Sequence, residues 1–166
     1  LSDQAFIQTE VRKMLDEGVI EPSNSPWRAQ IVVVKDETDR HRKRLCVDYS
    51  NTINIYTELD AYPLPRIDDM INTLSKYTVF STLDLKSAYH QIPIANKDKP
   101  YTAFEANGRL YQFRSVPFGV TNGVPSFQRI IDKIVDQDNL QDTFGYLDNI
   151  TIAGTTQETH DRNCGA

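Results

Sequence analysis

The sequence is poor in cysteine and has no long run of apolar residues. Its 166 residues include only Cys46 and Cys164, which are too few for a disulfide framework and do not form a Cys-x-x-Cys pair. This scarcity favours a reducing, intracellular setting. No run approaches the roughly 18 apolar residues that a membrane-spanning helix needs, and the mean hydropathy is −0.49. The sequence therefore predicts a protein without disulfides and without a membrane partner.

The two ends of the chain also lack expected features. Residues 1–4 have no initiating methionine and neither the basic end nor the apolar run of a signal peptide, so we expect an excised piece of a longer protein. Residues 161–166 show no closing element. The length suits one domain or one compact pair of subdomains, and a hydrophobic content of 39% is enough for a folded core.

An excess of positive charge is absent as well. The formal net charge is −5, which by itself argues against nucleic-acid binding. Basic residues nevertheless cluster at positions 40–44, and the carboxylates of an active site would add to the acidic count. Net charge alone therefore does not exclude a nucleic-acid partner.

Hydrophobic spacing in the first part of the chain predicts a helix and a finger-like hairpin. Ser2 can cap the helix and Gly18 can end it. Two apolar runs then flank a highly charged loop, as in a hairpin. The predicted segments are a helix over residues 2–17, a turn-rich loop over 21–26 followed by Trp27 as an anchor, strands over 31–34 and 45–47, and the charged loop over 35–43.

The rest of the chain mixes helices and strands without regular alternation, which indicates an α+β fold. Asn107-Gly108 is its strongest hairpin signal. The predicted segments are helices over 66–75 and 124–135, strands over 79–85, 144–147 and 150–153, and a hairpin over 101–113. The aromatic residues expected in the core, rather than stacked on bases, are Trp27, Tyr101, Phe104, Tyr111 and Phe113.

Two aspartates stand at the ends of apolar strands. Asp84 closes the predicted strand over 79–85, and Asp148 lies between two apolar runs. A carboxylate at a buried strand end costs solvation energy unless a cation or a donor compensates, and hard divalent cations bind carboxylate oxygens. Each aspartate taken alone is also an ordinary turn or strand-end residue. The residues themselves leave both interpretations open.

Five segments together resemble gypsy-type retrotransposon reverse transcriptases, which are RNA-directed DNA polymerases. The resemblance implies a right-hand polymerase with an antiparallel palm sheet packed on helices and no thumb. It places residues of about 1–75 and 90–115 mostly in the fingers, and about 76–90 and 116–166 mostly in the palm. The segments are Pro22-Ser23-Asn24-Ser25-Pro26-Trp27, Arg44-Leu45-Cys46-Val47-Asp48-Tyr49, residues 80–92 (FSTLDLKSAYHQI), Pro117-Phe118-Gly119-Val120-Thr121-Asn122 and Tyr146-Leu147-Asp148-Asn149.

The resemblance also implies roles for single residues. Asp84 and Asp148 would hold two Mg²⁺ ions, with Mn²⁺ as a substitute, and Asn149 takes the place of a third catalytic residue. Arg44 resembles the fingers arginine that grips the triphosphate. Lys35 resembles its lysine partner, and a solvated loop lysine is an equal alternative.

Further implied contacts concern the incoming nucleotide and the template. Tyr89 resembles the residue beneath the sugar, which selects deoxynucleotides, although core packing is an alternative. Gly119 would allow its backbone to approach closely in the pocket, and an ordinary turn glycine is the alternative. The implied nucleotide-binding residues are Leu85, Ala88, Tyr89, Phe118 and Gly119, and the implied template or primer contacts are Tyr146 and Pro117.

Asn149 departs from the family, which normally has Tyr-x-Asp-Asp. An amide brings no charge, so we expect activity well below that of a form with the aspartate restored. The implied partners are an RNA or DNA template with its primer, dNTPs and a Pol polyprotein, in a cytoplasmic virus-like particle or in the nucleus. Two alternatives remain: a degenerate copy that folds without polymerising, and an RNA-dependent RNA polymerase, against which Tyr89 and residues 80–92 speak.

Overall fold

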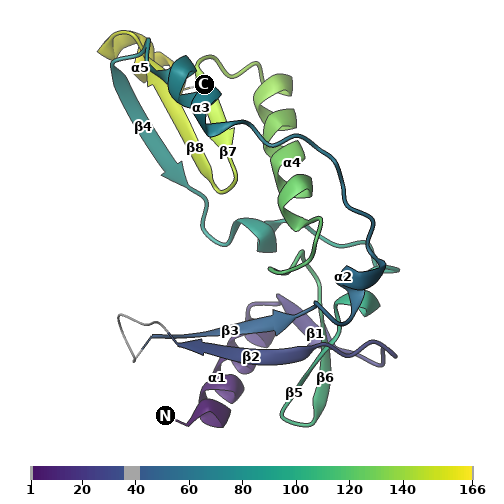
Figure 1. Ribbon diagram of the computed structural model, residues 1–166. Helices are drawn as coiled ribbons and strands as arrows, with labels where there is room; N and C mark the ends of the chain where they lie inside the picture. Colours follow the sequence, from purple (N-terminus) through teal and green to yellow (C-terminus); the bar gives the residue numbers. More distant parts are fainter. Residues whose placement is uncertain (1, 36–41, 166) are drawn as a thin grey trace. The chain divides into compact units, whose positions relative to one another are not determined.

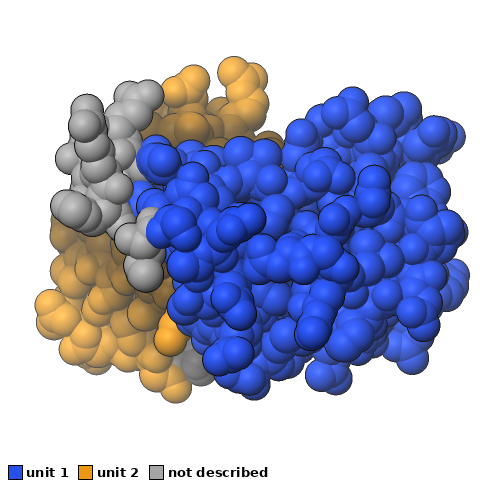
Figure 2. Space-filling model, turned by 90° about the horizontal axis from the view of Figure 1, so that it is seen from below, with its two compact units in different colours: residues 1–59, 89–123 blue, residues 60–88, 124–166 orange. Residues whose placement is uncertain are grey.

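The structure, a computed structural model, describes residues 2–35 and 42–165. The chain divides into two compact units, one formed by Leu1–Leu59 with Tyr89–Gly123 and the other by Asp60–Ala88 with Val124–Ala166 (Figure 2).

Every pair of named strands is antiparallel among the described residues, and helices are interspersed between them, which confirms the predicted α+β class (Figure 1). The helices are α1 (Asp3–Asp16), α2 (Ile53–Tyr56), α3 (Ile67–Leu74), α4 (Gly123–Gln137) and α5 (Gln157–Cys164), with 3-10 turns η1 (Ala88–Gln91) and η2 (Lys99–Thr102). The strands are β1 (Ile20–Pro22), β2 (Gln30–Lys35), β3 (Lys43–Asp48), β4 (Val79–Asp84), β5 (Phe104–Ala106), β6 (Arg109–Phe113), β7 (Thr143–Tyr146) and β8 (Asn149–Gly154).

Aromatic and aliphatic side chains of α1 and of the sheet β1-β6-β5 form the core of the first unit. Phe104, Tyr111 and Phe113 are buried there, as the sequence predicts, and the Phe104 ring centroid lies 5.9 Å from that of Tyr111 and 5.4 Å from that of Phe113. Tyr101 is an exception, because 41% of it is exposed and it packs edge-on against Trp27 instead.

Local signals in this unit are confirmed at three turns. The hydroxyl of Ser2 accepts a hydrogen bond from the Ala5 amide at 3.3 Å and so caps α1. Gly18, just after α1, has a left-handed φ of 70°. Asn107 and Gly108, with φ of 52° and 74°, join β5 to β6 as a hairpin turn of the mirror-image type requires.

Helices α4 and α5 pack against one face of the sheet β4-β8-β7 in the second unit. A Cβ on Gly145 of β7 would lie 2.1 Å from Cγ2 of Ile131 in α4. A Cβ on Gly154 of β8 would lie 2.4 Å from the backbone nitrogen of His160 in α5. Gly145 pairs with Ile150, which is four residues from Gly154 on β8, so both glycines face the same side of the sheet.

Two segments differ from the prediction. Ile20–Pro22 forms β1, although the sequence predicts a loop over residues 21–26; β1 is an edge strand, where a proline is tolerated. Residues 157–164 form α5, although the sequence shows no closing element there. This helix is polar and buries only His160, so it has little apolar periodicity, and Thr156 and Thr159 form its capping box. Among residues 2–35 and 42–165, every helix is too short or too polar to span a membrane.

Gly154→Ala is expected to destabilise the second unit. The added Cβ would meet the backbone of His160, which cannot turn away as a side chain can, and overpacking of this kind typically costs about 1–3 kcal/mol. Urea unfolding measures the change. Gly165→Ala is the matched control, because its Cβ would make only ordinary contact, 3.6 Å from the Asp161 carbonyl oxygen. An unchanged midpoint for Gly154→Ala would contradict the packing of α5.

Candidate active site

The turn between β7 and β8 presents Asp148 in a strained backbone. Tyr146 ends β7 and Asn149 begins β8, so Leu147 and Asp148 alone make the turn. Leu147 has a φ of 53°. This left-handed conformation costs a residue with a Cβ about 1–2 kcal/mol. The turn therefore depends on hydrogen bonds from its surroundings.

Strand β4 places Asp84 beside this turn. Asp84 pairs with Asn149 in the β4–β8 register, one residue from Asp148. The amide of Leu85 donates to the backbone carbonyl of Asp148 at 2.8 Å. The structure thus brings two aspartates that are distant in sequence to the same end of one sheet.

Neither aspartate is neutralised by a basic side chain. Among the described residues no ion pair involves Asp84 or Asp148. Asp84 is exposed and Asp148 is half-buried, and the Asn149 side chain donates from Nδ2 to Oδ1 of Asp148 at 3.3 Å. Two such carboxylates suit a hard divalent cation that takes its other ligands from substrate and water. The part of the chain that the structure describes holds no cluster of three His, Cys, Asp or Glu side chains placed for a metal.

The strand that carries Asp84 is less buried than the sequence predicts. Phe80 is 47% and Leu83 is 51% exposed. Asp84 therefore ends a largely exposed strand and not the buried one that the sequence predicts.

Gln128 of α4, which sequence analysis does not single out, holds the hairpin from the helix side. It is completely buried. Its Nε2 donates to the carbonyl of Gly145 and its Oε1 accepts from the amide of Leu147, both at 2.9 Å. With the Leu85 bond to Asp148, the strained turn is held from two directions. The available signal was a polar residue on the apolar side of a helix, next to Phe127.

In the first unit, the loop that begins at buried Pro117 packs against η1 and β3. The ring of Phe118, which is 61% exposed, meets buried Tyr89 edge-on at 4.7 Å between centroids. Gly119 has a φ of 89°, and a Cβ there would lie 3.4 Å from the Val47 carbonyl oxygen. The sequence predicts that this glycine lets backbone approach a nucleotide; in the structure the close approach is to β3.

The short turn η1 has two buried side chains, and two of its side chains pack against aromatic rings. Ala88 is 4% exposed and Tyr89 is 9% exposed. Burial lowers the pKa of His90, which favours the neutral ring at pH 7. That ring lies 5.9 Å from Phe118 and 6.4 Å from Phe113 between centroids. Tyr89 therefore sits in an aromatic cluster, as the core-packing alternative predicts.

Arg44 and Lys35 lie on opposite faces of the β2–β3 hairpin. Arg44 pairs with Val34 and Lys35 with Lys43, and successive pairs point to opposite faces of a ladder. Lys35 and Lys43 both reach the carboxylate of Asp3, with Nζ–Oδ distances of 3.6 and 2.7 Å. Arg44 is exposed. The structure does not bring the predicted triphosphate pair together; residues 36–41 of the charged loop lie outside the described residues.

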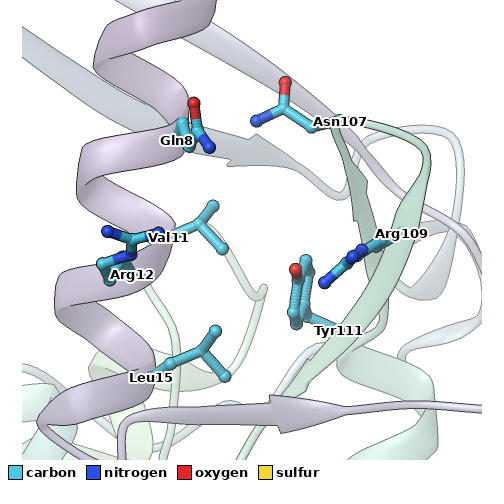
Figure 3. A pocket seen from close by; sticks show the side chains of 7 residues that line it. All are labelled: Gln8, Val11, Arg12, Leu15, Asn107, Arg109 and Tyr111. Atoms are coloured by element: carbon cyan, nitrogen blue, oxygen red, sulfur yellow. The ribbon is translucent and has the colours of Figure 1, made fainter.

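Each of the two units contains a surface cavity. One of about 390 Å³ opens between α1 and the β5–β6 hairpin, and its lining includes Val11 and Leu15 of α1 and Arg109 and Tyr111 of β6 (Figure 3). None of the predicted site residues lines it. The other, of about 320 Å³, belongs to the second unit, and its wall includes Asp132 and Gly145.

Comparison with known proteins identifies the family. The model of the family "Reverse transcriptase (RNA-dependent DNA polymerase)" matches residues 22–165. The chain belongs to the reverse transcriptase family. Members of this family use divalent metal ions. The predicted family is thereby confirmed.

Relatives of this reverse transcriptase domain are much longer proteins. The retrovirus-related Pol polyprotein from transposon gypsy of Drosophila melanogaster is 37% identical over 162 residues, which cover 95% of this chain and 16% of that protein. The enzymatic polyprotein of cauliflower mosaic virus (strain Strasbourg) is 31% identical over 160 residues, covering 95% and 23%. The chain therefore spans less than a quarter of either relative.

Solved reverse transcriptases confirm the predicted polymerase fold. The native prototype foamy virus protease–reverse transcriptase matches with a TM-score of 0.81 at 22% identity, over 99% of this chain and 22% of that one. The foamy viral protease–reverse transcriptase in complex with an RNA/DNA hybrid matches with a TM-score of 0.84 at 21% identity, over 96% and 21%.

Asn54 of α2 is a second residue of this reverse transcriptase domain that sequence analysis misses. Its Nδ2 donates to the Gly119 carbonyl at 2.8 Å, and its Oδ1 accepts from the Thr121 amide at 3.0 Å. One side chain thus pairs with both ends of the loop after Phe118. No local pattern marks Asn54, because its partners lie more than sixty residues away.

Asn54→Asp is expected to destabilise the first unit, because a carboxylate accepts from Thr121 but cannot donate to Gly119. Because the Gly119 carbonyl is at an exposed position, the expected loss is that of one ordinary hydrogen bond, about 0.5–1.5 kcal/mol. Urea unfolding at pH 7 tests this against Asn51→Asp, which makes the same charge change at an exposed position. Equal losses in the two variants would mean that charge, and not the lost bond, is responsible.

Proposed function

We propose that this reverse transcriptase domain carries the nucleotidyl-transfer site of an RNA-directed DNA polymerase, which adds deoxynucleotides to the 3′-hydroxyl of a primer. The observation that supports it most is the pairing of Asp84 with Asn149, together with the hydrogen bond from Leu85 to Asp148. These contacts gather two unneutralised carboxylates at one end of a sheet. We assign the first unit to the fingers and the second to the palm.

In this proposal Asp84 and Asp148 hold Mg²⁺, two ions in the complete site. Divalent cations, when bound, offset the negative charge on the attacking, leaving and transferred phosphoryl oxygens. The protein's own task is to keep both carboxylates in fixed positions. The β4–β8 ladder does this for Asp84, and the bonds from Leu85 and Gln128 do it for the turn that carries Asp148.

We propose that the primer terminus lies over a row of three side chains. Asp84 pairs with Asn149, and Asn149 pairs with Tyr146, so the three share one face of the sheet. Helices α4 and α5 cover the other face, where Gly145 and Gly154 lie against them. A nucleic-acid partner is supported by the foamy viral relatives, which are described in complex with an RNA/DNA hybrid and with double-stranded DNA.

Residues of the first unit are proposed to bind the incoming nucleotide. Arg44 is exposed and has no carboxylate partner within the described residues, and its guanidinium suits phosphate oxygens. Phe118 offers an exposed aromatic edge, backed by buried Tyr89. Lys35 would have to give up its ion pair with Asp3 before it could contact a triphosphate.

Asn149 weakens the proposed site in two ways. Its amide brings no negative charge, and it donates a hydrogen bond to Oδ1 of Asp148, an oxygen that a cation would otherwise use. An aspartate at this position would add charge and remove that donor. We therefore propose low activity for this chain; the competing proposal is a folded domain that does not polymerise.

Asn149→Asp is expected to raise primer extension on poly(rA)/oligo(dT) by about tenfold or more, since electrostatic stabilisation is the main protein contribution to phosphoryl transfer. It should also raise Mn²⁺ affinity, measured by titration calorimetry without nucleic acid. Asp148→Ala should abolish both signals in either background. Unchanged Mn²⁺ affinity in both variants would refute the metal-ligand role, whereas binding without extension would favour the inactive alternative.

Arg44→Ala is expected to raise the KM for dNTP about tenfold in the Asn149→Asp background, because a charge-assisted contact to phosphate is lost. Lys35→Ala is the matched control: it removes one positive charge from the same hairpin, on the face that packs against Asp3. Steady-state kinetics at saturating template–primer gives both values. Equal KM increases in the two variants would show that the total positive charge of the β2–β3 hairpin is responsible, and not the face on which Arg44 lies.

A further inference from the structure

A network of polar side chains runs through the second unit from the segment before α3 to the catalytic hairpin. Its centre is Gln128, which is completely buried in α4. The amide nitrogen of Gln128 donates to the carbonyl of Gly145 and to Oδ1 of Asp132, each at 2.9 Å. Its oxygen accepts from the amide of Leu147, also at 2.9 Å.

The direction of the Gln128 amide decides whether the hairpin is held. In the observed direction, oxygen faces the N–H of Leu147 and nitrogen faces the carbonyl of Gly145. Rotated by half a turn, the amide would set donor against donor and acceptor against acceptor. The carboxylate of Asp132 can only accept, so it favours the direction in which the Gln128 nitrogen faces it. Asp132 thereby adds a third group, after Gly145 and Leu147, that favours the state in which both sides of the turn are bonded.

Asp132 is itself held by the chain segment before α3. The hydroxyl of Tyr62 donates to Oδ2 of Asp132 at 2.5 Å, and this hydrogen bond raises the pKa of the Tyr62 phenol, which keeps it a donor. The Arg129 guanidinium lies 4.7 Å from the centroid of the Tyr62 ring, and its Nη2 donates to both carboxylate oxygens of Asp60, at 2.8 and 2.9 Å. Tyr62 is therefore fixed both by its ring and by its hydroxyl.

We propose that Asp132 and Tyr62 are positioning residues for the catalytic turn, acting through the amide of Gln128 on Leu147 and so on the direction of Asp148. The consequence for catalysis rests on the proposed function, whereas the effect on the turn does not. Leu147 is the sensitive point, because its left-handed backbone has few alternatives to the bond from Gln128.

Tyr62→Phe tests the proposal with little risk to folding, because it keeps the ring against Arg129 and deletes only the hydroxyl. Asp132→Asn is the stronger variant, because an amide can also donate and no longer supports one direction for Gln128. The matched control is Tyr77→Phe. Tyr77 also donates to an aspartate, Asp142, at 2.5 Å in the same unit, but Asp142 has no bond to Gln128.

The readout is hydrogen exchange of the Leu147 backbone amide, followed by NMR on the whole chain without substrate. Tyr62→Phe and Asp132→Asn should speed exchange at Leu147 about tenfold, the equivalent of one lost hydrogen bond, with smaller changes at the Leu85 amide. Tyr77→Phe should leave Leu147 unchanged. Unaltered exchange at Leu147 in a folded Asp132→Asn protein, or an equal effect of Tyr77→Phe, would overturn the proposal.

A kinetic arm connects the network to the proposed function. In the Asn149→Asp background, Tyr62→Phe should raise the Mg²⁺ concentration for half-maximal extension about threefold or more and leave the KM for dNTP unchanged. A change in KM alone would argue against positioning of Asp148. If no variant polymerises, the proposed function fails, while the exchange result still decides whether Asp132 and Tyr62 hold the turn.

Discussion

The antiparallel register of β4 against β8 is the constraint on which the rest of the candidate site depends. It sets Asp84 opposite Asn149. A slip by one residue would turn Asp84 to the face that α4 and α5 cover, because side chains alternate along a strand. Gly154 opposes a slip of β8, since any other residue carried to its place would bring a Cβ against the His160 backbone. Packing on one face of the sheet thus sets the chemistry available on the other.

In the turn between β7 and β8, local backbone strain is offset by hydrogen bonds from other parts of the unit. Leu147 adopts a conformation that costs about 1–2 kcal/mol, and each hydrogen bond to the turn contributes about 1 kcal/mol. The bonds from Gln128 and Leu85 are together large enough to offset the strain. They come from a helix and a strand on different sides, so the turn keeps one direction.

The sequence predicts correctly those local structures that depend on residues close together in the chain. The Ser2 cap and the Asn107-Gly108 turn follow from residue chemistry within a few positions, and the proximity of Asp84 to Asp148 followed from the family resemblance. Gln128 and Asn54 were out of reach, because an amide does not reveal partners that lie 19 or 65 residues away. The separation of Arg44 and Lys35 was missed for another reason: it depends on the strand register around a loop, which composition does not give.

Asn149 shows why fold and family do not by themselves decide activity. Its backbone continues the ladder with Asp84 and Tyr146, and its side chain is exposed, so the sheet forms with either an amide or a carboxylate there. Like charges directly opposite each other in a ladder are destabilising. An aspartate at 149 would face Asp84 in this way, and Asn149 removes that repulsion. Asn149 in place of the family's aspartate therefore stabilises the sheet when no metal is bound, and it weakens the proposed metal site. At this one position, stability and the proposed function oppose each other.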